Sequence, residues 1–147
     1  MALAEIYDAS VNPTAEYQRL VSIASRGTVT AGDGALIGGF VVVGNAPKTL
    51  LIRGIGPTLT SFGLVGALAD PVLTIYDGGE ALAINVGWAN LAEITTAATE
   101  AGAFALTTGS RDAALLVTLK PGSYTAQVKA AQVTSSGVAL IEIYEVP

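Results

Sequence analysis

The stretch PVLTIYDGGEALAINVG, residues 71–87, carries the clearest strand signal in the chain. In each half, large apolar residues stand at alternate positions and therefore share one face of an extended strand: Leu73 and Ile75, then Leu82, Ile84 and Val86. The Asp-Gly-Gly-Glu run between the halves is typical of a tight hairpin turn. Residues 71–87 are therefore predicted to form an antiparallel β-hairpin.

Similar short apolar runs, separated by glycine, proline or polar residues, occupy the rest of the chain. Strands are expected at 2–8, 17–25, 36–44, 48–54, 113–119, 124–130 and 137–145. One helix is expected at about 90–102, with Asn90 as its cap, Glu93 reaching back to the cap, and Gly102 ending it. About nine strands and one short helix predict an all-β protein, an antiparallel β-sandwich or jelly roll.

The two ends of the chain repeat one phrase. ALAEIYD at 2–8, hereafter the N-terminal phrase, matches ALIEIYE at 139–145 in Ala, Leu, Glu, Ile and Tyr. The sequence therefore predicts an N-terminal strand, 1–10, that duplicates the C-terminal strand, followed by a single β-sandwich domain, 11–147. The run VNPT at 11–14 is expected to be a turn or linker, because Pro13 favours an extended Asn12.

Composition limits the classes of function. The 147 residues are 51% hydrophobic and 13% charged, with a net charge of −5. An acidic chain without a basic cluster is a poor partner for nucleic acid, and no apolar run approaches the ~20 residues of a membrane-spanning helix. A chain with so little charge is expected to bury surface against other molecules, here copies of itself.

Residues able to perform catalysis are scarce. The chain has no His and no Cys, which excludes a Ser-His-Asp triad, a thiolate nucleophile and a structural zinc site. Asp33, Asp70, Asp77 and Glu80 lie in or beside glycine-containing turns, where they serve either turn formation or calcium binding. The carboxylates do not have the spacing of a calcium-binding loop, so no metal site is predicted. Because catalytic residues are also missing, the chain is predicted to be no enzyme and to bind no cofactor.

Four further side chains are candidate ligand-binding residues. Arg26, Arg53 and Arg111 each stand at a junction between a strand and a turn, where they either bind an anion or tie loops together through carbonyl groups, Asp70 or Asp112. Trp88, the only tryptophan, either stacks on a sugar or packs against the helix. In each case the structural role is favoured.

Much of the chain resembles a known module. The phrases RLVSIASRGTVTAGDGALIGGFVVVGNAPKTLLIRGIGPTL, LADPVLTIYDGGEALAINVGW, SRDAALLVTLKPGSYTAQV and GVALIEIYEVP resemble a tandem repeat module of very large exported bacterial surface proteins. Residues 70–77 and 119–128 also resemble, more loosely, the bacterial pre-peptidase C-terminal type of β-sandwich. The resemblance implies an extracellular or cell-surface location and a non-catalytic role. At 85–88 the chain has Asn-Val-Gly-Trp where such sandwiches often carry acidic residues, which weakens the case for calcium.

The repeated phrase supplies the functional hypothesis. The candidate subunit interface comprises Leu3, Ala4, Glu5, Ile6 and Tyr7 together with Leu140, Ile141, Glu142, Ile143 and Tyr144. The N-terminal phrase of one copy is expected to dock beside, or in place of, the C-terminal strand of another, and head-to-tail contacts of this kind build filaments unless they close into a ring. Two alternatives remain: the phrase is a remnant of a preceding module in a tandem chain, or the domain is a carbohydrate- or matrix-binding adhesin module.

Overall fold

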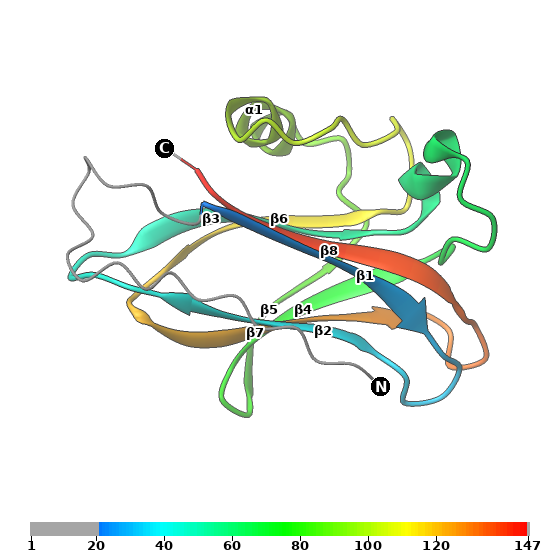
Figure 1. Cartoon of the computed structure of the whole chain (residues 1–147), viewed down its shortest axis with the longest axis horizontal. Coiled ribbons are helices and arrows are strands. Elements are labelled where there is room, and N and C mark those ends of the chain that lie inside the picture. The colour runs from blue at the N-terminus through cyan, green and yellow to red at the C-terminus, as the bar shows by residue number, and fades with distance from the viewer. Residues whose placement is uncertain (1–20, 147) are drawn as a thin grey trace.

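The computed structural model describes residues 21–146, which form a sandwich of two antiparallel sheets (Figure 1). Sheet I has the strand order β1-β8-β3-β6, and sheet II has the order β2-β7-β4-β5. The strands are β1 (Ser22–Val29), β2 (Leu36–Val42), β3 (Lys48–Ile55), β4 (Pro71–Asp77), β5 (Glu80–Val86), β6 (Ala113–Leu119), β7 (Gly122–Ala130) and β8 (Gly137–Glu145). Apart from the β4–β5 hairpin, each strand is followed by a strand of the opposite sheet, which gives a jelly roll.

The fold class predicted from the sequence is confirmed. Each strand expected between residues 17 and 145 is present, although the first begins at Ser22 rather than at residue 17. The expected strand at 2–8, and with it the N-terminal unit 1–10, lies outside the described residues. The division of the chain into 1–10 and 11–147 therefore stays a prediction.

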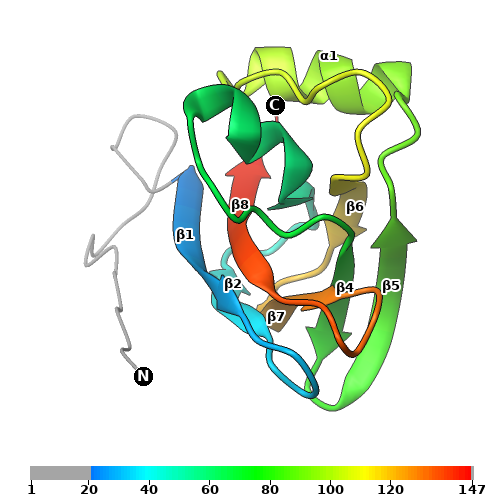
Figure 2. The same cartoon turned by 90° about the vertical axis from the view of Figure 1, so that its right-hand side faces the viewer.

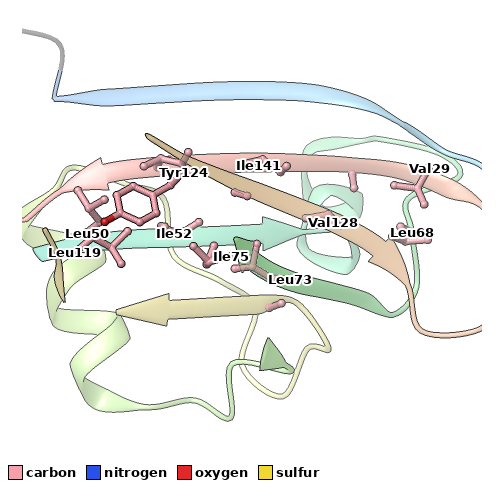
Figure 3. Packing of buried hydrophobic residues seen from close by; sticks show 14 of the residues in the cluster. Val29, Leu50, Ile52, Leu68, Leu73, Ile75, Leu119, Tyr124, Val128 and Ile141 are labelled. Carbon is pink, nitrogen blue, oxygen red and sulfur yellow. The ribbon is translucent and has the colours of Figure 1, made fainter. Parts of the chain in front are cut away.

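The main hydrophobic core lies between the two sheets. Figure 3 shows Ile52 of β3, Ile141 of β8 and Val128 of β7 among the buried side chains that meet there. All three are exposed by 2% or less. Their alternation along each strand is the period-two pattern of the sequence, so this core follows directly from the local strand signals.

A second core, hereafter the outer core, lies on the opposite face of sheet I. Helix α1 (Ala92–Glu100) and the 3-10 helix η1 (Pro57–Phe62) both cover this face (Figure 2). The buried members are Leu51, Ile55, Leu59, Trp88, Ile94, Ala97, Ala98, Leu106 and Ala114. Sheet I is therefore covered on both faces, whereas no helix covers the outer face of sheet II within the described residues.

The ends of α1 differ from the prediction at one terminus. Its N-cap is Leu91, without a side-chain cap, while Asn90 has a left-handed backbone (φ 56°) and its Oδ1 accepts a hydrogen bond from Gly109 N at 2.7 Å. The predicted capping by Asn90 and Glu93 is therefore wrong, because Asn90 joins two loops instead. Gly102 (φ 69°) does follow the helix end, and its N–H donates to Thr99 O, as predicted.

The helix η1 was not predicted, and its entry depends on a close backbone approach. A Cβ atom on Gly56 would lie 2.0 Å from the carbonyl oxygen of Leu68. Only glycine fits at this position, because the neighbouring atom is backbone and cannot rotate away. The sequence between β3 and β4 contains proline and glycine but no helical spacing of apolar residues, so it does not predict this helix.

The β4–β5 hairpin forms as predicted, with a bulge between Ile75 and Tyr76. Leu73 and Ile75 are fully buried in the main core. The apolar residues of the second strand share one face, but it is the outer face of sheet II, since Ile84 pairs with Thr74 and is 62% exposed. The apolar alternation therefore predicted strand β5 correctly, but it did not indicate whether the apolar face of β5 points into the core or outward.

Candidate assembly site

Strand β8 is the structural counterpart of the N-terminal phrase, and its two faces serve different cores. Ala139, Ile141 and Ile143 point into the main core. Leu140 and Tyr144 pack against the outer core. This alternation is that of an extended strand, and it shows what each repeated residue does once the strand is in a sheet.

Glu142 neutralises a buried cation. Arg53 of β3 is fully buried, and its Nε donates to Glu142 Oε2 at 2.9 Å, with its Nη2 donating to the same oxygen. Its Nη1 donates to the carbonyl oxygen of Phe104 at 2.6 Å, and the Phe104 ring centroid lies 4.5 Å from Arg53 Cζ. An arginine without water needs such partners, because leaving a buried charge unpaired is costly.

Tyr144 completes the cluster by donating from its hydroxyl to Glu142 Oε1 at 3.0 Å. Burial raises the pKa of Tyr144 above its usual value, and the negative charge of Glu142 raises that pKa further. Both carboxylate oxygens of Glu142 are therefore engaged. The phrase shared by the two ends repeats both of these polar residues, as Glu5 and Tyr7.

Both edges of β8 are already paired. β1 lies along one edge, with Ala24 opposite Glu142, and β3 lies along the other, with Arg53 opposite Glu142. A strand from another copy therefore has no room beside β8 within sheet I. The sequence predicts that the phrase docks either beside the C-terminal strand or in place of it. Docking beside β8 is therefore excluded, so the phrase must either replace β8 or pair with a different strand.

Replacement of β8 by the N-terminal phrase is unfavourable on packing grounds. Ile141 is 2% exposed in the main core, and the phrase has Ala4 at the equivalent position. Removing a buried isoleucine side chain to the β-carbon costs about 2–5 kcal/mol. The chain's own β8 therefore fills its place better than the repeated phrase does.

Within residues 21–146, the free edges of the sandwich are β1 and β6 in sheet I and β2 and β5 in sheet II. The amide N–H of Ala114 in β6 is partly protected, because it donates to Asn85 Oδ1 of β5 at 3.0 Å. β2 carries no charged residue, and β1 carries the single cation Arg26, which is exposed. Unprotected edges with few charges are the places where a sheet accepts another strand.

Another polar cluster, which the sequence did not reveal, centres on Asp112. This residue is fully buried, and Oδ1 of its carboxylate accepts from Gly56 N at 2.7 Å. Oδ2 accepts from Thr58 N at 3.2 Å and from the hydroxyls of Thr58 and Ser110. Asp112 thereby caps η1, although the residues it joins lie far apart in the chain. No local pattern signals such a contact.

The residues weighed as ligand-binding residues fall into different environments. Trp88 is 5% exposed in the outer core beside α1, and its Nε1 donates to Ser110 Oγ at 3.1 Å. Packing against the helix is therefore correct for Trp88, and sugar stacking is wrong, because its ring has no open face. Arg53 is equally unavailable to an external anion, since it is fully buried and paired with Glu142.

The other two arginines are exposed. Arg111 forms an ion pair with Asp70, as expected for an arginine that ties two loops together. The two residues border a shallow depression of about 290 Å³, which Asn90, Gly109 and other loop residues also line. Arg26 projects from β1, and within residues 21–146 no ion pair joins it. The structure therefore does not bring the three arginines together.

The acidic residues considered for calcium binding do not gather at one site, although Asp77 and Glu80 pair with each other across the hairpin. Asp77 and Glu80 flank the hairpin turn, and Asp70 is engaged with Arg111. Among the described residues, no three carboxylate, imidazole or thiol side chains gather in a metal-binding arrangement. No helix in this part of the chain has the length and apolar character needed to cross a membrane.

These features define the part of the chain that the structure describes, residues 21–146, as an eight-stranded jelly-roll β-sandwich. No family model matches the sequence, and no curated protein matches it. Among solved structures, it is similar to the pre-peptidase C-terminal domain of a collagenase from Bacillus anthracis. The TM-score is 0.50 at 15% sequence identity, over 90% of this chain and 98% of that domain. This likeness supports the sandwich resemblance drawn from the sequence, and it concerns the fold alone.

Proposed function

We propose that this chain is a non-catalytic structural module that self-associates head to tail through its N-terminal phrase, as a building block of an extracellular fibre or surface array. One observation carries the proposal: the phrase repeats, as Glu5 and Tyr7, the polar residues of β8 in the cluster at the buried Arg53, and it keeps the apolar residues of β8 except for Ala4 in place of Ile141. A segment with these residues is suited to pairing in a sheet, and the sandwich of another copy offers a sheet that it can join.

The non-catalytic role is supported by the use made of the buried polar groups. Glu142 is engaged with Arg53 and Tyr144, and Asp112 is engaged with the backbone and hydroxyls around η1. Both carboxylates serve the packing of sheet I. The extracellular location rests on the resemblance to exported surface modules and on the likeness in fold to the pre-peptidase C-terminal domain of a collagenase.

The self-association is tested by deleting residues 1–10. The full chain is expected to form species larger than a monomer as its concentration rises, seen by light scattering after size-exclusion chromatography and by negative-stain microscopy. The shortened chain is expected to stay monomeric with an unchanged circular dichroism spectrum. A full chain that stays monomeric throughout contradicts the proposal, and it favours the view of the phrase as a remnant of a preceding module.

A further inference from the structure

Building on the proposed self-association, we propose that the free edge of β1 accepts the N-terminal phrase of a second copy, with Arg26 binding Glu5. The phrase would become a fifth strand of sheet I, outside β1. This assigns an acceptor strand and an anchoring residue to the contact, neither of which follows from the repeat itself.

The first argument is the availability of the edge. Among the strands that the structure describes, β1 is at one edge of sheet I, and β8 pairs with only one of its two sides. The outer edge of β6, at the opposite side of this sheet, is partly closed where Ala114 N–H donates to Asn85. β1 thus presents N–H and C=O groups that another strand can pair with, and its place in the sandwich need not change.

The second argument is charge. Arg26 is the only charged residue of β1, it is exposed, and within residues 21–146 it has no ion-pair partner. Its backbone lies opposite Leu140 of β8, which places its side chain on the outer face of sheet I. The phrase carries one glutamate in its middle, Glu5. β2 has no cation, and β5 begins with Glu80, which would repel that glutamate.

The third argument is register. β8 contains the C-terminal copy of the repeated phrase, and β1 already pairs with it. In this pairing Ala24 lies opposite Glu142, and Ile23 lies opposite Ile143. A second copy of the phrase in the same register would place Glu5 opposite Ala24 and diagonal to Arg26. Diagonal neighbours on one face of a sheet lie ~7–8 Å apart, within reach of long charged side chains.

The same register covers an exposed apolar residue. Ile23 belongs to the core-facing side of β1, yet it is 37% exposed because it lies at the sheet edge. Ile6 of the docked phrase would lie directly opposite it. The alternation of the phrase therefore matches both faces of β1, with the charged contact on the outer face and the apolar contact on the inner face.

A second copy is a better source of the phrase than the same chain. Within one chain, residues 9–21 would have to connect the phrase to β1, whereas most β-hairpin loops have ~2–5 residues. The segment also contains Asn12-Pro13, which favours an extended chain. A contact between two copies uses different surfaces on each copy, so it continues from copy to copy into a filament.

Disulfide trapping between two different variants tests the contact. Because the natural chain has no cysteine, only the introduced cysteines can form a disulfide. Full-length chains bearing Ile6→Cys and Ile23→Cys are mixed, one of them labelled with ¹⁵N, and oxidised mildly. Mixed-isotope disulfide dimers are then counted by mass spectrometry. The control mixture pairs Ile6→Cys with Val133→Cys, since Val133 is 73% exposed and distant from β1 in sequence. We expect at least a tenfold excess of mixed dimers over this control.

Charge reversal supplies an independent arm. Arg26→Glu and Glu5→Arg are each expected to raise the concentration needed for assembly by about fivefold to thirtyfold, since each replaces an attraction by a repulsion. The double variant should restore assembly. Lys120→Glu, an exposed residue of the β6–β7 turn, is the matched control and should change little.

The outcomes separate the two proposals. If the full chain assembles and loses assembly on deletion of residues 1–10, but neither trapping nor charge reversal exceeds its control, the β1 acceptor is wrong and the proposed function stands. If the double variant Ile6→Cys/Ile23→Cys forms only an intrachain disulfide at low concentration, the occupant is the same chain, which overturns the contact between copies. If the full chain never assembles, both proposals fail.

Discussion

Replacing Glu142 by Gln is expected to destabilise the sandwich severely. The substitution keeps the size of the side chain and removes its charge, so Arg53 stays fully buried without its counter-ion. Breaking a buried ion pair by removing one partner typically costs about 3–5 kcal/mol. The amide oxygen of glutamine can still accept hydrogen bonds from Arg53, so we expect a loss at the lower end of this range, about 3 kcal/mol. A domain of this kind has a total stability of only about 5–15 kcal/mol.

The same substitution three residues further along β8 provides the control. Glu145 forms its ion pair with Lys48 at 2.8 Å, and the two side chains are 21% and 32% exposed. Partly hydrated pairs of this kind contribute about 0.2–1 kcal/mol. Glu145→Gln should therefore lower the free energy of unfolding by at most about 1 kcal/mol, in the same strand and with the same change of net charge.

Urea unfolding followed by circular dichroism measures both variants against the unaltered chain. The midpoint should fall much further for Glu142→Gln than for Glu145→Gln, with an unchanged slope, because the area exposed on unfolding is the same. Equal losses in the two variants, or a loss below about 1 kcal/mol for Glu142→Gln, would refute the reasoning. The burial of Arg53 would then be compensated by Phe104 rather than by the carboxylate.

Three further changes test other parts of the structure. Asp112→Ala leaves the buried N–H groups of Gly56 and Thr58 without an acceptor, so it should cost about 3 kcal/mol in urea unfolding, whereas Asp77→Ala in the exposed hairpin turn should have little effect. Because the pKa of Tyr144 is raised above 10.0, the folded state holds a proton that the unfolded chain loses first, so stability should fall as pH rises above about 10. Tyr144→Phe should lessen that fall, as seen by comparing urea midpoints at about pH 8 and about pH 11. Gly56→Ala should lower the thermal midpoint sharply, because its Cβ would overlap Leu68 O, while Gly39→Ala in β2, with no atom within 4 Å of its Cβ, should leave it nearly unchanged.

Local patterns predicted the strands well and the polar clusters poorly. The strand at 137–145 was predicted correctly, because apolar alternation is a property of neighbouring residues. The pairing of Arg53 with Glu142 was not found, since the two residues meet only when β3 and β8 lie side by side. The same holds for Asp112, whose partners lie in a helix that has no sequence signal of its own.

The sequence by itself determined the class of fold and revealed the end-to-end repeat. Apolar alternation, turn residues and the repeated phrase can each be recognised within a short stretch of residues. Only the tertiary structure decided what the repeated strand can do. It placed β8 between β1 and β3, buried Trp88 and Arg53, and left β1 at an open edge with Arg26 exposed. The physical reason is that side-chain direction depends on neighbouring residues, whereas burial and edge position depend on which strands pair, and pairing joins residues that are distant in the chain.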